Sequence, residues 1–226
     1  MTETRILSTA TTGRYLVEAS PHPFGDDALL VGFHGYGQNA EHLLQELRRI
    51  PGVAGWTLVA IQALHRFYSP KTREVVGSWM TSLDRELAIE DNLAYVGRVI
   101  ADLRPEGGTG KLVFAGFSQG AAMAWRAAAR CEPCHGLIVL GGDLPRDVAE
   151  APALHLPPML IGRGEQDSLY TAQQLAKDLI TLETLGLQAG IVHFDGGHEW
   201  GPDFLEAAGR FLESVRGGST RDKAGQ

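Results

Sequence analysis

The sequence predicts an α/β fold in which a mostly parallel central sheet is covered by helices on both faces. Short apolar runs with little polar alternation recur along the chain, and such runs are typical of strands that are buried on both faces. Segments with apolar residues at helical spacing lie between these runs. This alternation of strands and helices predicts an open, doubly wound sheet.

Six apolar runs are the candidate strands of this sheet, and residues 14–18 add a candidate strand at one edge. In such sheets the loops that follow the strands converge on one edge, so functional side chains gather at the carboxyl ends of the strands. The six runs are residues 28–33, 57–61, 112–115, 137–140, 159–161 and 190–194.

Helices are predicted between the runs and after the last of them. The first follows an N-cap at Asn39, and the second ends before Pro105. A third begins with a capping box of Thr171 and Gln174 and ends near Gly186. A fourth helix follows the last apolar run. In chain order, the apolar faces of the four helices carry Leu43, Leu44, Leu47 and Ile50; Leu93, Val96, Ile100 and Leu103; Leu175, Leu179 and Leu182; and Phe204, Ala208, Phe211, Leu212 and Val215.

Length and composition favour a single domain over residues 1–226. The chain is 44% apolar, which is enough to build a core without disulfides. No linker rich in proline, glycine or serine divides it. We expect residues 14–216 to form the ordered core and residues 217–226 to form a flexible tail.

Charge and hydropathy exclude several classes of partner. The net charge is −7 and no lysine or arginine cluster is present, which argues against nucleic acid and anionic membranes. Residues 1–13 lack the apolar region of a signal peptide, and no run is long enough to span a bilayer. We therefore predict a cytoplasmic protein without stable membrane insertion; a homodimer is compatible with the sequence.

The two cysteines, Cys131 and Cys134, have the C-x-x-C spacing of redox motifs. They follow the helix that begins after residue 118, and the dipole at a helix C-terminus disfavours a thiolate. With His135 they supply three potential zinc ligands, whereas a structural zinc site takes four. We expect free or adventitiously paired thiols here, and no metal or other cofactor.

Residues 116–120 read G-F-S-Q-G and lie between an apolar run and an alanine-rich helical segment. This pattern predicts a strand, a tight turn and a helix, with Ser118 exposed at the apex in front of the helix N-terminus. Glycine and serine are common in turns, so the motif alone is weak, but the strand-to-helix context makes it specific. It predicts that Ser118 is the nucleophile of a hydrolase.

A serine hydroxyl needs a base to accept its proton, and the base needs an acid that orients it. His198 fits the role of base best, because it follows the last strand in a glycine-containing loop just before the final helix. His193 lies inside that strand and is predicted to be structural. The histidines in surface-like contexts are His22, His42, His65, His135 and His155.

The acid is expected between Ser118 and His198 in chain order. Asp167 follows the run 159–161, and Asp143 follows the preceding run, so the strand-end rule fits both. The turn-rich loop and the helix cap after it favour Asp167. Asp143 remains a competitor, and either aspartate could instead bond its own turn.

Two backbone N–H groups are candidates for stabilising the oxyanion of a tetrahedral intermediate. The N–H of Gln119 lies at the N-terminus of the helix after Ser118. The N–H of Tyr36 lies in the segment H-G-Y-G, residues 34–37, whose glycines allow close backbone approach. His34 has no partner at metal-ligand spacing, and the segment lacks the later glycine and lysine of a phosphate-binding loop.

Four segments in this order resemble the phospholipase/carboxylesterase family of small α/β-hydrolases, which includes acyl-protein thioesterases and lysophospholipases. They are H-G-Y-G at 34–37, G-F-S-Q-G at 116–120, G-R-G-E-Q-D at 162–167 and G-H-E at 197–199. The resemblance covers about residues 25–215 and implies an α/β-hydrolase fold without a large cap domain. It implies a triad of Ser118, Asp167 and His198. Tyr36 and Gln119 carry over as the main-chain oxyanion donors.

The resemblance also matches Trp79 to a family tryptophan beside the active site, and residues 142–145 to a strand-end turn. Departures from the family pattern are Gln38, Met80, Thr81 and Ala121, and none of them is a reacting group. Apolar or amphipathic side chains expected to border the acyl group are Phe67, Tyr68, Trp79, Met80 and Leu144. An alternative that fits the sequence equally well is that these aromatic side chains only pack the loop 63–84 onto the sheet and do not bind substrate.

The predicted reaction is the hydrolysis of small carboxylic esters or thioesters, with short to medium acyl groups, through an acyl-enzyme. Two alternatives stay open: a non-catalytic module that binds a small apolar ligand on a hydrolase scaffold, and a cofactor-free perhydrolase that uses the same triad. The complete set of serine, aspartate and histidine argues against the first, because a binder gains nothing from an activated nucleophile.

Overall fold

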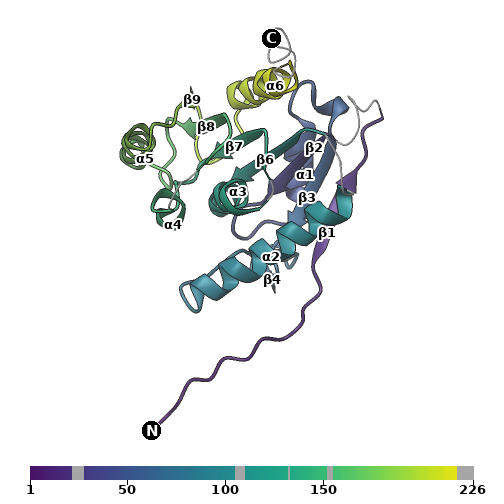
Figure 1. Ribbon diagram of the computed structural model, residues 1–226, viewed down its shortest axis with the longest axis vertical. Helices are drawn as coiled ribbons and strands as arrows, with labels where there is room; N and C mark the ends of the chain where they lie inside the picture. Colours follow the sequence, from purple (N-terminus) through teal and green to yellow (C-terminus); the bar gives the residue numbers. More distant parts are fainter. Residues whose placement is uncertain (22–27, 105–109, 132, 152–154, 218–226) are drawn as a thin grey trace, which may run out of the picture.

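The central sheet has seven strands in the order β1-β3-β2-β6-β7-β8-β9 (Figure 1). The computed structural model describes residues 1–21, 28–104, 110–131, 133–151 and 155–217. Strand β1 pairs antiparallel with β3, and the other neighbouring strands pair in parallel. The strands are β1 (Arg14–Glu18), β2 (Leu29–Phe33), β3 (Thr57–Gln62), β6 (Leu112–Phe117), β7 (Gly136–Leu140), β8 (Met159–Gly164) and β9 (Ala189–Phe194).

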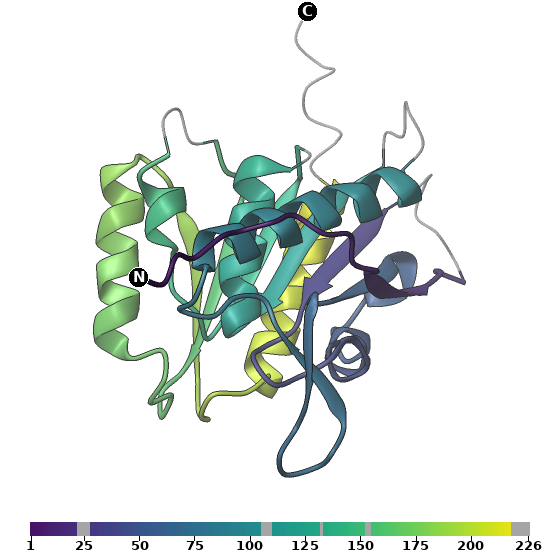
Figure 2. The ribbon, with the colours of Figure 1, turned by 90° about the horizontal axis from the view of Figure 1, so that it is seen from below.

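Helices cover both faces of the sheet (Figures 1 and 2). Consecutive strand residues point to opposite faces, so Leu30 belongs to the core cluster under α1 and α6, and Val31 belongs to the cluster under α2, α3 and α5. None of the described segments forms a cap domain over the carboxyl ends of the strands. The helices are α1 (Ala40–Arg48), η1 (Val53–Gly55), α2 (Arg85–Leu103), α3 (Gln119–Arg130), α4 (Arg146–Ala149), α5 (Ala172–Thr184) and α6 (Pro202–Gly217).

The predicted strands and helix signals are confirmed. The side chain of Asn39 accepts a hydrogen bond from the His42 N–H at 2.9 Å, and Thr171 forms the capping box with Gln174 at the start of α5. Gly186 follows α5 with φ +71°, a left-handed conformation that favours glycine after a helix. Three predictions fall outside the described residues: the stop at Pro105, the surface position of His22 and the tail from residue 218 onward.

The loop predicted over residues 63–84 contains a two-stranded hairpin that the sequence did not reveal. Strands β4 (His65–Tyr68) and β5 (Val75–Ser78) pair antiparallel, and the hairpin projects from the body of the molecule (Figure 2). Its strands are only four residues long, and they carry charged as well as apolar residues. The signal of alternating polarity was therefore too short to distinguish these strands from a loop.

The cysteines lie at the C-terminal end of α3, as predicted. Cys131 directly follows the helix, and no disulfide joins it to Cys134. Burial raises the pKa of Cys134 to about 12, which is the opposite of the shift that activates a thiolate. Among the described residues, no helix combines the length and the apolar character that crossing a bilayer requires.

Candidate active site

Ser118 lies at a tight turn between β6 and α3. Its backbone has φ 55° and ψ −122°, a conformation that side chains rarely adopt, and its N–H donates to the Leu140 carbonyl at 2.8 Å. Glycines on both sides allow this turn, because a Cβ at Gly116 would lie 2.3 Å from the Gly120 carbonyl oxygen. The turn therefore holds Ser118 at the carboxyl end of a central strand, as the motif predicted.

Replacing Gly120 with alanine should lower the free energy of unfolding by about 3 kcal/mol. The new Cβ would lie 2.1 Å from the Phe33 carbonyl oxygen and 2.5 Å from that of His34, and backbone atoms cannot move aside as a flexible side chain can. Urea unfolding measures the change. Gly97→Ala is the matched control: a Cβ there has no neighbour within 4 Å, so an alanine in this helix should stabilise by about 0.5–1 kcal/mol. Equal stability of the two variants would contradict the close approach.

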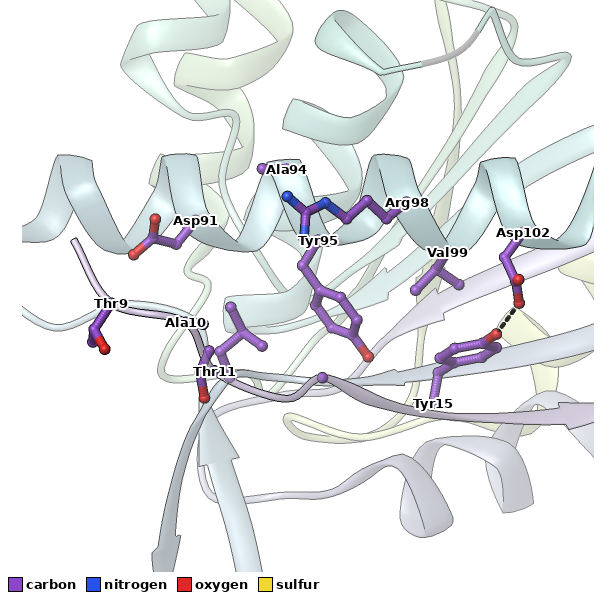
Figure 3. Close-up of a pocket in the computed structure, with 12 residues that line it drawn as sticks. Thr9, Ala10, Thr11, Tyr15, Asp91, Ala94, Tyr95, Arg98, Val99 and Asp102 are labelled. Carbon is purple, nitrogen blue, oxygen red and sulfur yellow. Dashed lines mark hydrogen bonds between the residues drawn. The ribbon is translucent and has the colours of Figure 1, made fainter.

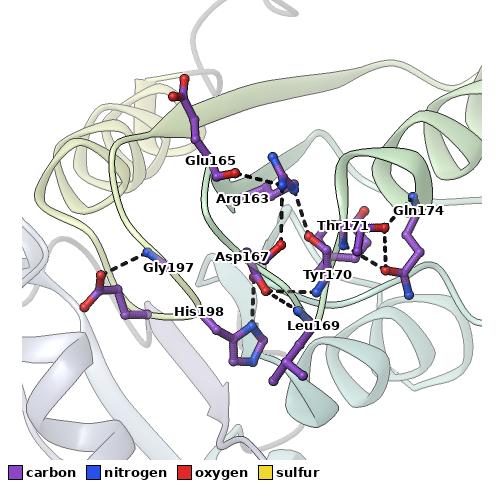
Figure 4. Close-up of polar contacts among 10 residues, drawn as sticks. Arg163, Glu165, Asp167, Leu169, Tyr170, Thr171, Gln174, Gly197 and His198 are labelled. Carbon is purple, nitrogen blue, oxygen red and sulfur yellow. Dashed lines mark hydrogen bonds and ion pairs between the residues drawn. The ribbon is translucent and has the colours of Figure 1, made fainter.

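His198 and Asp167 form a hydrogen-bonded pair at the ends of β9 and β8 (Figure 4). The distance from His198 Nδ1 to Asp167 Oδ2 is 2.8 Å. The other carboxylate oxygen of Asp167 accepts from the N–H groups of Leu169 at 2.8 Å and Tyr170 at 2.9 Å. His198 Nε2 is buried and has no hydrogen-bond partner among the described residues. The pair therefore orients the imidazole and leaves its second nitrogen available.

Main-chain hydrogen bonds join the loop that carries Asp167 to the loop that carries His198. The N–H of Glu165 donates to the Phe194 carbonyl at 2.9 Å, and that of Gln166 donates to the Gly196 carbonyl at 2.9 Å. Arg163 is 7% exposed, and its guanidinium donates to the carbonyls of Tyr170, Glu165 and Asp167 at 2.8, 3.1 and 3.4 Å (Figure 4). The acid and the base are thus held on one connected unit.

A glycine pair lies against both this unit and the serine turn. A Cβ at Gly141 would lie 3.0 Å from His198 Cε1, and one at Gly142 would lie 2.5 Å from the Ser118 carbonyl oxygen. His198 also stacks on Phe117, the residue before Ser118, with ring centroids 4.7 Å apart. These contacts bring the predicted nucleophile and base together at one edge of the sheet.

The competing acid, Asp143, does not contact the histidine. It is exposed and forms no hydrogen bond or ion pair with His198 among the described residues, although both line the cavity beside Ser118. Asp167, in contrast, is 4% exposed and bonded to the ring. The geometry therefore favours Asp167, as the turn-rich loop predicted.

The two predicted oxyanion donors both have unused N–H groups. Within the described residues, neither the N–H of Tyr36 nor that of Gln119 donates a hydrogen bond. The segment with Tyr36 lies next to the serine, because a Cβ at Gly35 would be 3.4 Å from Ser118 Cβ. Gln38 holds this segment in its turn, since its Oε1 accepts from the Gly35 N–H at 2.9 Å.

His34 is a buried support of this segment, and both of its ring nitrogens contact main-chain atoms. Its Nε2 accepts from the Ala63 N–H at 3.1 Å, and its Nδ1 lies 2.8 Å from the Gly35 carbonyl, so a proton on Nδ1 satisfies both contacts. Burial lowers the pKa of His34 to about 4, and the ring is therefore neutral at neutral pH. Within the described ranges, no group of three or more His, Cys, Asp or Glu side chains is arranged to hold a metal ion.

This lowered pKa should make stability depend on pH. A histidine whose pKa is 6.5 unfolded and about 4 folded must charge as the protein unfolds, so stability is lost as pH falls from 6.5 to 4, by up to about 3 kcal/mol. Urea unfolding at pH 7 and pH 5 measures this. We expect the drop in the free energy of unfolding from pH 7 to pH 5 to be about 2 kcal/mol smaller in His34→Gln than in the wild type, and to keep its wild-type size in His42→Gln. A drop of wild-type size in His34→Gln would contradict this prediction.

The cavity beside Ser118 has a volume of about 250 Å³. Of the five predicted substrate-binding side chains, Met80 lines it. Trp79 and Leu144 are not among the residues that line it; Trp79 is fully buried, and Leu144 is 7% exposed with its N–H bonded to Asp178 at 3.0 Å. Phe67 and Tyr68 lie on the hairpin, where Phe67 stacks on Tyr36 at 5.6 Å and Tyr68 is exposed.

Sequence reasoning missed several side chains that line the same cavity. Leu169 and Tyr170 follow Asp167 by two and three positions, so the acid-bearing loop itself was a signal for them. Arg85 is contributed by the start of α2 and Gln174 by the first turn of α5, and nothing in their local sequence marked them. The cavity wall is therefore more polar than the predicted acyl contacts suggested.

A larger cavity of about 570 Å³ lies away from this site, between the N-terminal segment and α2 (Figure 3). Tyr15 and Tyr95 line it, and the Tyr15 hydroxyl donates to Asp102. It contains neither a histidine nor a cysteine. Volume alone therefore does not select the candidate active site, and the hydrogen-bonded pair of His198 and Asp167 favours the smaller cavity.

Comparison with known proteins supports the fold. No family model and no curated protein matches the sequence, but solved structures do. Esterase PE8 is 27% identical with a TM-score of 0.71, and the match covers 90% of this chain and 98% of PE8. Acyl-protein thioesterase 2 of Zea mays is 19% identical with a TM-score of 0.73, covering 91% and 100%.

A phospholipase/carboxylesterase from Dyadobacter fermentans is 19% identical with a TM-score of 0.67, and the match covers 91% of this chain and 99% of that one. These similarities each cover at least 90% of this chain. The chain therefore has the α/β-hydrolase fold and resembles the phospholipase/carboxylesterase family.

Proposed function

We propose that the protein is a serine hydrolase that cleaves small carboxylic esters or thioesters of short to medium acyl groups. The observation that carries the proposal is the His198–Asp167 pair: Nδ1 is bonded at 2.8 Å to a buried carboxylate. Nε2 has no hydrogen-bond partner in the part of the chain that the structure describes, and His198 lines the same cavity as Ser118. An imidazole held in this way can accept a proton from a serine hydroxyl. The esterase and thioesterase names of similar structures support the same class of reaction.

The reaction proceeds in two halves. Ser118 Oγ attacks the substrate carbonyl while its proton passes to His198 Nε2, and the Tyr36 and Gln119 N–H groups stabilise the oxyanion. The intermediate collapses by breaking the bond to the leaving alcohol or thiol, which takes the proton from His198. Water then attacks the acyl-enzyme with His198 as base, and the carboxylic acid and free Ser118 are released.

The cavity supports an acyl group of limited size. Its volume of about 250 Å³ is below the range of roughly 300–1,000 Å³ typical of drug-sized ligands. Met80 and Leu169 supply apolar wall, and Arg85 and Gln174 supply polar wall. We therefore expect rates to fall with acyl chains too long for this space.

Covalent labelling with a fluorophosphonate tests the proposal. We expect one label per chain, on the peptide that contains Ser118, and loss of the label after preincubation with a p-nitrophenyl ester. A panel of oxygen and sulfur esters from acetyl to dodecanoyl then defines the substrate. Absence of both labelling and turnover would contradict the enzyme assignment and favour a binding module, and peracid formation faster than hydrolysis would favour a perhydrolase.

A further inference from the structure

The side chain of Gln119 joins the start of α3 to the segment that follows the hairpin. Its Oε1 accepts from the Trp79 N–H at 2.9 Å, and its Nε2 donates to the Met80 carbonyl at 2.8 Å. The Ser78 hydroxyl lies 3.3 Å from the same amide and donates to the Met80 carbonyl at 2.8 Å. The amide thus uses both its donor and its acceptor on one short segment, which fixes the orientation of the residue whose own N–H is an oxyanion donor.

The indole of Trp79 continues this connection to the second donor. Its Nε1–H donates to the His34 carbonyl at 2.7 Å, and its ring contacts those of Phe33 and His34 at 5.5 and 5.2 Å. The His34 carbonyl directly precedes the segment that carries the Tyr36 N–H. Trp79 is fully buried, and the Asn92 side chain bonds its carbonyl at 3.0 Å, so the indole is held rigidly.

We propose that Gln119, through its side chain, and Trp79 are positioning residues that together set the separation of the two oxyanion donors. The inference rests on the proposed function. A chain of hydrogen bonds runs from Gln119 to Trp79 and on to His34, and each end of the chain is covalently close to one of the donor N–H groups. The donors come from different elements, α3 and the loop after β2, and this link adds a side-chain connection to the close approach of Gly120 to the Phe33 and His34 carbonyls.

A connection of this kind acts on the transition state more than on the bound substrate. Oxyanion donors are aimed at the charged oxygen that develops during attack, and losing one donor costs about 100- to 1,000-fold in kcat. A displaced donor loses part of that effect. Because the neutral carbonyl of the substrate gains less from the same donors, KM should change little.

Three substitutions test the inference. Gln119→Met removes both side-chain bonds at nearly constant length, and Trp79→Phe removes the indole N–H but keeps a ring. We expect kcat for p-nitrophenyl butyrate to fall by ~10- to 100-fold in each, with KM within ~3-fold. A trifluoromethyl ketone, whose adduct carries the oxyanion, should bind more weakly by the same factor as kcat/KM falls. Gln119→Glu keeps the acceptor for the Trp79 N–H, but its second carboxylate oxygen would face the Met80 carbonyl and add negative charge near the oxyanion, so its loss of kcat should be at least as large as that of Gln119→Met.

Trp125→Phe is the matched control. Trp125 lies in α3, is 1% exposed, and its indole N–H has no hydrogen-bond partner within the described residues. Loss of this indole should leave kcat within ~2-fold of wild type. Thermal unfolding of each variant shows whether it is folded. If Trp79→Phe is too unstable to assay, the kcat of Gln119→Glu, whose side chain has the shape of the native one, still tests the inference.

The double variant tests whether the two side chains act together. If both residues act in one chain, Gln119→Met with Trp79→Phe should lose less than the product of the single losses. Unchanged kcat in folded single variants, an equal loss in Trp125→Phe, or a rise in KM alone would each overturn the inference. These outcomes are distinct from failure of the proposed function, in which the wild-type protein itself would neither turn over esters nor react with a fluorophosphonate.

Discussion

Replacing Ser118 with alanine should lower kcat for a p-nitrophenyl ester by about five to six orders of magnitude. The substitution removes the attacking oxygen but leaves His198 and the oxyanion donors in place, so only the slow attack of water on bound substrate remains. Alanine introduces no new strain at φ 55°, because serine already occupies that conformation. Steady-state hydrolysis and thermal unfolding of the purified variant measure the two effects.

Ser214→Ala provides the control for this prediction. Ser214 lies on α6 and is exposed, and its hydroxyl donates to the Phe211 carbonyl at 2.7 Å. We expect this variant to hydrolyse esters at the wild-type rate and to be labelled by a fluorophosphonate. Full activity of Ser118→Ala, or a loss of activity caused by misfolding, would remove the support for a nucleophile at the serine turn.

Replacing Asp167 with asparagine should lower kcat by about four orders of magnitude. The native Oδ1 accepts from two N–H groups, so the asparagine oxygen is expected to occupy that position and its NH₂ to face His198 Nδ1. An amide donor there forces the ring proton onto Nε2, which then cannot accept the proton of Ser118. The rate should be restored in part at high pH, where hydroxide can take the role of the base.

Asp143→Asn is the matched comparison, because Asp143 was the rival acid and lines the same cavity. Since Asp143 is exposed and is not bonded to His198 among the described residues, its substitution should change kcat by less than about 3-fold, with any larger effect on KM. The reverse ranking of the two variants would reassign the acid.

The inner strands of the sheet, from β3 to β8, were predictable because each is buried on both faces and therefore reads as a continuous apolar run. Beta-strand β2, for example, has five buried residues in a row. The hairpin of β4 and β5 was not predictable, because each strand is only four residues long and β4 is mostly exposed. Burial on both sides leaves a signal in the sequence, whereas pairing at the surface leaves almost none.

For the site, chain order and strand ends indicated residues that the fold brings near one another: Asp167 is bonded to His198, and His198 lines one cavity with Ser118. They could not separate Asp167 from Asp143, because the carboxyl ends of adjacent parallel strands are equivalent by that rule. What distinguishes them is three-dimensional: the backbone bonds between the loops after β8 and β9 bring Asp167, and not Asp143, to the histidine. The catalytic roles themselves stay predictions until the variants are measured.

The cavity wall was the least predictable part. The aromatic side chain of Trp79 suits a substrate contact, but aromatic side chains are equally suited to a core, and the fold buries Trp79 completely. Arg85 reaches the cavity from a helix whose start lies far from Ser118 in the chain. Such contacts depend on how separate elements converge, which local patterns do not encode.

The position of β9 at the border of the sheet has one more consequence. Its hydrogen-bonding partner on one side is β8, and on the other side it has no strand among the described residues, so fraying should begin there and not at β6 in the middle. The strand that precedes the His198 loop can thus open while the serine turn and most of the interior stay intact. We therefore expect heating to abolish activity at a lower temperature than the one at which the whole protein unfolds.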